Sequence, residues 1–116
     1  MYKYRAPVYS IVINTAEHTL YLYIDDGLYK TYPVAVGKPS TPSPKGTFTI
    51  LHKSLYPGGP FGARWMGLSK PHYGIHGTNN PNSIGKDISH GCIRMQNEDV
   101  IELYDLVLIG DIVEII

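Results

Sequence analysis

The sequence has little of what disulfide scaffolds, nucleic-acid-binding proteins and membrane proteins need. One cysteine among 116 residues excludes an internal disulfide. Ten Lys and Arg balance ten Asp and Glu, and no basic run appears, so nucleic acid is not expected as a partner. The apolar runs fall well short of the ~20 residues of a membrane-spanning helix. No signal peptide is evident, because Val8–Ile13 is too short and too interrupted for an apolar core.

Turn-forming residues and tyrosine are abundant instead. The chain holds 12 Gly, 9 Pro and 10 Tyr, a balance that favours strands joined by turns. With 43% hydrophobic residues, its length suits one compact core. No internal repeat or linker interrupts the sequence, so we expect a single domain over residues 1–116.

Alternating patterns predict the strands. Segment 18–25 alternates aliphatic residues with Tyr21 and Tyr23, which predicts one apolar and one aromatic face. The following Asp25-Asp26-Gly27 predicts a hairpin turn in which glycine takes the positive φ. Further strands are expected at 9–14, 28–36, 47–52, 65–68, 73–76 and 112–116, with irregular Gly/Pro loops at 37–46 and 57–62.

One segment, 98–108, is expected to be helical. Asn97 is a suitable N-cap, and Glu98 and Asp99 suit the positive end of a helix dipole. The residues expected on its apolar face are Val100, Ile101, Tyr104, Val107 and Leu108. The predicted fold is therefore mainly β, with one clear helix after Cys92.

The lone cysteine, Cys92, allows three interpretations: a buried inert thiol, an intermolecular disulfide or a nucleophile. A nucleophilic cysteine needs a base or a positive field, and two histidines are candidates. His90 lies two positions away and would share a face with Cys92 in an extended segment. His76 lies further upstream and reaches Cys92 only if the intervening loop folds back. The residues alone do not choose between them.

Zinc is a further alternative, because His72, His76, His90 and Cys92 are all metal-binding side-chain types. The sequence lacks a second cysteine and the spaced Cys/His pairs of structural zinc sites. We therefore expect no metal and no other cofactor.

The run Ser89-His90-Gly91-Cys92-Ile93-Arg94-Met95, preceded by His76-Gly77-Thr78-Asn79, resembles the catalytic signature of the YkuD-type L,D-transpeptidases. The blocks 36–38, 41–42, 44–48 and 73–78 follow the order found in that domain, so the resemblance covers nearly the whole chain. It implies a β-sandwich-like catalytic domain of a bacterial enzyme that cross-links peptidoglycan.

The resemblance also implies roles for individual residues. Cys92 would be the nucleophile and His76 its base, oriented by the backbone carbonyl of Gly77. Lysine replaces His90 in some members, so His90 would tune the site or contact substrate. Ser89 would be a hydrogen-bonding loop residue.

Weaker expectations concern the surroundings of Cys92. Backbone N–H groups of Gly91 and Cys92 would form an oxyanion hole. Arg94 would hold a substrate carboxylate, or else form a structural salt bridge. The residues expected to line the acyl-donor groove, or else to pack in the core, are Trp65, Met66 and Tyr73.

The implied reaction joins two peptidoglycan stem peptides. A tetrapeptide donor would form a thioester with Cys92 and release D-alanine, and an amine of a second stem would then form a 3→3 cross-link. Hydrolysis of the same thioester, as in an L,D-carboxypeptidase, is the alternative, and a non-catalytic peptidoglycan-binding module is a third. The resemblance further implies labelling by carbapenems and a location in the cell envelope or a spore wall.

Overall fold

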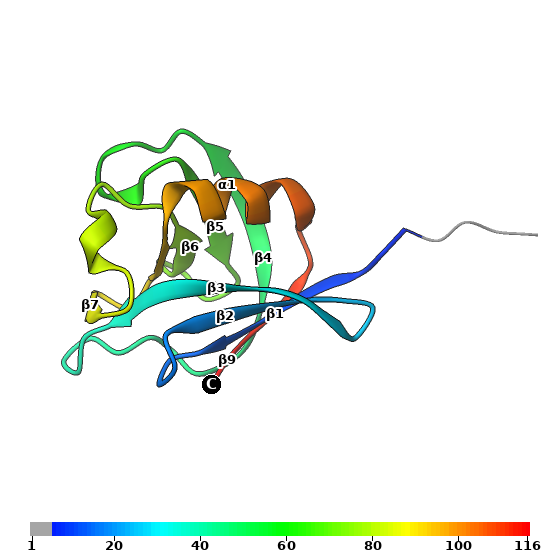
Figure 1. Ribbon diagram of the computed structural model, residues 1–116, viewed down its shortest axis with the longest axis horizontal. Helices are drawn as coiled ribbons and strands as arrows, with labels where there is room; N and C mark the ends of the chain where they lie inside the picture. The colour runs from blue at the N-terminus through cyan, green and yellow to red at the C-terminus, as the bar shows by residue number, and fades with distance from the viewer. Residues whose placement is uncertain (1–5) are drawn as a thin grey trace, which may run out of the picture.

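A computed structural model describes residues 6–116 of the chain (Figure 1). The helix is α1 (Asn97–Leu106), and two short 3₁₀ turns are η1 (Gly59–Phe61) and η2 (Pro81–Ser83). The strands are β1 (Tyr9–Asn14), β2 (Thr19–Ile24), β3 (Gly27–Gly37), β4 (Gly46–Leu55), β5 (Arg64–Leu68), β6 (Gly74–His76), β7 (Asp87–Ser89), β8 (Ile93–Met95) and β9 (Ile112–Ile115). The predicted class, mainly β with one helix after Cys92, is confirmed.

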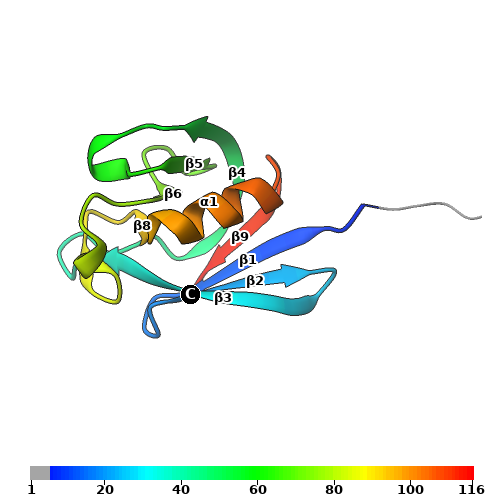
Figure 2. The same ribbon diagram turned by 45° about the horizontal axis from the view of Figure 1, so that its top comes forward.

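The strands form one sheet that closes on itself. Their order is β2-β1-β9-β4-β5-β6-β8-β3-β7, and closure follows because β3 also pairs with β2. β3 changes partners along its length: residues 27–33 pair with β2, and residues 34–35 pair with β8. β4 also changes partners: residues 46–49 pair with β9, and residues 50–55 pair with β5. These two long strands join two layers into a β-sandwich-like, barrel-like fold (Figure 2).

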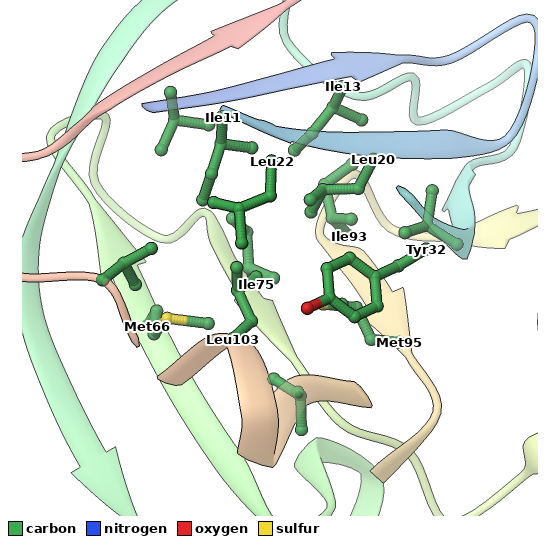
Figure 3. Close-up of a cluster of buried hydrophobic side chains, with 14 of the residues drawn as sticks. Ile11, Ile13, Leu20, Leu22, Tyr32, Met66, Ile75, Ile93, Met95 and Leu103 are labelled. Atoms are coloured by element: carbon green, nitrogen blue, oxygen red, sulfur yellow. The ribbon is translucent and has the colours of Figure 1, made fainter. Parts of the chain in front are cut away.

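The core lies between the layers and is completed by α1. Leu20 and Leu22 of β2 are fully buried, while Tyr21 and Tyr23 are only half-buried, as the alternation predicts. Leu103 of α1 packs in the same cluster (Figure 3). Burial of this apolar surface supplies the main stabilising free energy and fixes the strands that carry the site.

Helix α1 differs in detail from the prediction. Its N-cap is Gln96, without a side-chain hydrogen bond, and Asn97 is the first helical residue. Leu103, absent from the predicted apolar face, is fully buried, whereas Leu108 lies beyond the helix and is 61% exposed. At the C-terminal end, Lys53 Nζ of β4 donates to the Tyr104 carbonyl in the last turn, at 2.6 Å, and to the carbonyl of the C-cap residue Val107, at 2.8 Å.

The β2–β3 turn confirms the hairpin but corrects its chemistry. Asp25 and Asp26 take the positive φ values, 47° and 70°, while Gly27 already pairs with Ile24. The two aspartates therefore occupy the left-handed region that the prediction assigned to glycine. The three-residue strands β7 and β8 were not predicted. Within residues 6–116 no helix is long and apolar enough to cross a membrane.

Candidate active site

Three neighbouring strands carry the residues singled out in the sequence. His76, at the end of β6, lies opposite Trp65 of β5 on one side and Arg94 of β8 on the other. Directly opposed residues of neighbouring strands share a face of the sheet. Cys92 directly precedes β8, two positions before Arg94, so continuing the strand periodicity by one residue would put it on that face as well. The fold thus brings together His76 and Cys92, which are far apart in sequence.

The opposite face of the same strands is the core. Met66 follows Trp65 and pairs with Ile75, and both Met66 and Ile75 have no exposed surface. Since successive strand residues point to opposite sides, Met66 cannot share the face of Trp65. The expectation that Met66 lines a groove is therefore wrong. Trp65 and Tyr73 are half-buried and lie beside His76 and Gly91, respectively.

The loop before Cys92 is held by Ser89. Its Oγ accepts the Gly91 N–H at 3.0 Å and donates to the Cys92 carbonyl at 2.6 Å. Its own carbonyl accepts from the Thr41 hydroxyl at 3.0 Å. Gly91 has a φ of 115°, and a Cβ there would come within 2.5 Å of the Tyr73 ring. Only glycine fits this position without strain, so the turn that presents Cys92 depends on it.

His76 is buried in an aromatic setting. Trp65 stacks on its ring at 5.6 Å between centroids, and Phe61 meets it edge-on at 5.1 Å. Its Nδ1 lies 2.6 Å from the Gly77 carbonyl oxygen. Since a carbonyl can only accept, Nδ1 carries the proton and neutral His76 has an unprotonated Nε2. Burial lowers the pKa of His76 to about 4, and the Arg94 charge adds to the effect.

Cys92 is partly buried, and burial raises the pKa of its thiol. A backbone hydrogen bond from Gly74 and the positive charge of Arg94 act in the opposite direction. Sγ lies 3.6 Å from the His72 carbonyl oxygen and donates to it. At neutral pH the two groups therefore rest as a neutral thiol and a neutral imidazole, not as an ion pair.

Arg94 and His90 stand in different relations to Cys92. The guanidinium of Arg94 lowers the pKa of both Cys92 and His76. Arg94 forms no salt bridge within residues 6–116, which does not favour the structural alternative for it. His90 is exposed and makes no hydrogen bond to any other described residue. Across residues 6–116, no three His, Cys, Asp or Glu side chains gather as metal ligands.

The influence of Arg94 can be measured directly. Arg94→Gln removes the nearby cation, so the pKa of the Cys92 thiol is expected to rise further. The measurement is the iodoacetamide alkylation rate of Cys92 against pH, whose midpoint should move to higher pH. Lys70→Gln, which removes a cation that does not shift the pKa of Cys92, serves as control. An unchanged midpoint in Arg94→Gln would contradict this electrostatic role.

Two residues at the site were missed by the sequence reasoning. Phe61 lies in the 57–62 loop, where no periodic pattern distinguishes it from a turn residue. Asn97 was interpreted as a helix cap, yet its side-chain amide bonds the backbone of Ala63 and Thr78. Their roles depend on tertiary contacts that local sequence does not encode.

Comparison with known proteins identifies the family. The family described as L,D-transpeptidase catalytic domain, YkuD, matches residues 8–115. The chain belongs to the YkuD family. YkuD of Bacillus licheniformis is 57% identical to this chain over 107 residues. Its name assigns it L,D-transpeptidase activity by inference only. That alignment covers 92% of this chain but 65% of the relative, so the chain spans just under two thirds of it.

Solved structures share the fold of this YkuD-family chain. L,D-transpeptidase 3 of Mycobacterium tuberculosis superimposes with a TM-score of 0.86 at 22% identity, covering 95% of this chain and 61% of that one. A structure of the LD transpeptidase LdtMt1 in complex with imipenem superimposes at 0.82, with 23% identity and coverage of 95% and 59%. At this level of identity the likeness establishes the architecture alone.

Proposed function

We propose that this YkuD-family chain is the catalytic domain of a cysteine-dependent L,D-transpeptidase acting on peptidoglycan stem peptides. One observation supports this above all. His76 of β6 pairs with Arg94 of β8, Cys92 directly precedes β8, and the imidazole presents an unprotonated Nε2. A nucleophile, a base and a group that orients the base are the parts that acyl transfer needs.

The first half-reaction makes a thioester. The thiol turns from the His72 carbonyl toward His76, and Nε2 takes its proton as Sγ attacks the carbonyl of the third stem residue. The tetrahedral intermediate collapses, the bond to the terminal D-alanine breaks, and Nε2–H returns the proton to the leaving amine. Catalytic hydrogen bonds are often loose before substrate binds, so the resting thiol position is compatible with this step.

The Cys92 amide is the better candidate for stabilising the intermediate. The Gly91 N–H already donates to Ser89 Oγ, so it is engaged in the resting loop. Loss of one oxyanion donor typically costs about 2.7–4 kcal/mol in transition-state stabilisation.

The second half-reaction transfers the acyl group. An amine of a second stem attacks the thioester carbonyl, gives a proton to His76 and forms the 3→3 amide bond. Sγ leaves as a thiolate and recovers the proton from His76, which restores the resting site. The same thioester reacts with water in the alternative carboxypeptidase reaction. A location at the cell envelope or spore wall follows from this substrate.

Incubation with a disaccharide-tetrapeptide tests the proposal. Mass spectrometry should detect an acyl adduct on Cys92, released D-alanine and a cross-linked dimer. Cys92→Ala should form neither adduct nor product, because alanine offers no nucleophile.

The products distinguish the alternatives. Tripeptide without dimer would assign the hydrolytic reaction, whereas substrate binding with no adduct would assign a binding module. Turnover by Cys92→Ala at the unsubstituted rate would refute the mechanism.

A further inference from the structure

The side chain of Asn97 joins the two segments that surround His76. Asn97 Oδ1 accepts the Ala63 N–H at 3.0 Å and the Thr78 N–H at 3.1 Å. Its Nδ2 donates to the Thr78 carbonyl at 2.9 Å. One amide at the start of α1 is thus bonded to the loop that follows η1 and to the chain just beyond β6.

The Thr78 N–H belongs to the peptide group that orients the catalytic base. That peptide consists of the Gly77 carbonyl and the Thr78 N–H, and it is planar and trans, so the two bonds point in opposite directions. Asn97 holds the N–H end, and the carbonyl end accepts from His76 Nδ1 at 2.6 Å. A rotation of this peptide would remove the acceptor that keeps the proton on Nδ1.

The hydrogen bond from the Ala63 N–H to Asn97 concerns a second neighbour of the imidazole, Phe61. Ala63 follows η1, which carries Phe61, and the Phe61 ring meets His76 edge-on at 5.1 Å. The hydrogen bond that holds Ala63 therefore helps to keep the Phe61 ring against the imidazole. Gly62 and Gly77 allow the Asn97 side chain to come close to the backbone, because a Cβ on either would collide with Asn97 Oδ1.

We propose that Asn97 is a positioning residue that holds the Gly77–Thr78 peptide, and through it the Nδ1–H tautomer of His76, for attack by Cys92. Its relevance to turnover rests on the proposed function, but its effect on the tautomer does not. The tautomer decides whether Nε2 has a lone pair facing the thiol or a proton that blocks the transfer. Asn97 itself does not touch the reacting atoms.

Asn97→Ala tests this inference in the protein without substrate. The ¹⁵N chemical shifts of His76 at pH 7 report which ring nitrogen is protonated. The unsubstituted protein should show the Nδ1–H form, and Asn97→Ala should populate the Nε2–H form. The rate of Cys92 acylation by imipenem should fall by about 10–100-fold, because small misplacements of catalytic groups have effects of this size.

Gln96→Ala is the matched control. It removes the adjacent side-chain amide, which bonds the Pro81 carbonyl at 3.2 Å instead of the backbone of Ala63 or Thr78. Both the tautomer and the acylation rate should stay unchanged in it. A folded Asn97→Ala that keeps the Nδ1–H form and an acylation rate within twofold would overturn the inference.

Asn97→Asp decides the matter if the alanine variant does not fold. Aspartate keeps an oxygen for the Thr78 N–H, while its second oxygen puts an acceptor in place of the Nδ2 donor beside the Thr78 carbonyl. The inference expects a folded Asn97→Asp to retain the Nδ1–H form, and loss of that form would count against it. If the tautomer changes as expected but imipenem does not acylate even the unsubstituted protein, the proposed function fails while the positioning role stands.

Discussion

His76→Asn is expected to reduce the rate of Cys92 acylation by imipenem by about 10²–10⁴-fold, the usual contribution of a general base. Asparagine is chosen because its Nδ2–H can still donate to the Gly77 carbonyl, where Nδ1–H donates in the native site. The variant thus keeps that interaction and lacks the basic Nε2. Intact-protein mass spectrometry over time measures the adduct.

His90→Asn is the matched comparison, since it makes the same change at the histidine nearest to Cys92 in sequence. His90 is exposed and bonded to no other described residue, so its replacement should slow acylation far less. If His90→Asn proved the slower of the two variants, His76 would not be the base. Sequence spacing left this choice open, and the parallel pairing of β6 with β8 supplies the reason to favour His76.

The sequence predicts this fold best where a pattern is long and regular. The alternation in β2 correctly assigns Leu20 and Leu22 to the core and Tyr21 and Tyr23 to the other face. The pattern succeeds because burial on one face fixes the register of the strand. Strands of three residues, such as β8, have too few alternations to be recognised this way.

The site is less predictable because its contacts are tertiary. Met66 was grouped with Trp65, although strand periodicity alone separates neighbouring residues, and the β5–β6 register confirms that separation. Asn97 has the residue type and position of a helix cap. Its amide instead bonds two backbone segments that are 19 and 34 residues away. No local signal distinguishes these two uses of an asparagine.

Acidification should destabilise this protein more than it destabilises His76→Asn. Burial lowers the pKa of His76 from 6.5 to about 4, so between these values the unfolded state binds more protons than the folded state. The free energy of unfolding therefore rises with pH in this window. The stabilisation that depends on a neutral His76 is fully present above pH 6.5 and is lost as the pH falls toward 4. A change of this size corresponds to about 3 kcal/mol.

Urea unfolding at pH 7 and pH 4 measures the effect as a difference between proteins. Carboxylates titrate in both proteins, so their contribution cancels in the difference. Between pH 7 and pH 4, the unsubstituted protein should lose about 3 kcal/mol more of its free energy of unfolding than His76→Asn loses. His52→Asn, at an exposed histidine, is measured in parallel as the comparison for the loss of a histidine outside the site. Parallel pH curves for the unsubstituted protein and His76→Asn would mean that His76 binds its proton as readily in the folded state as in the unfolded state, and would contradict the lowered pKa. The acid loss of stability and the availability of Nε2 as a base at neutral pH thus share one cause, the burial of His76 against Phe61 and Trp65.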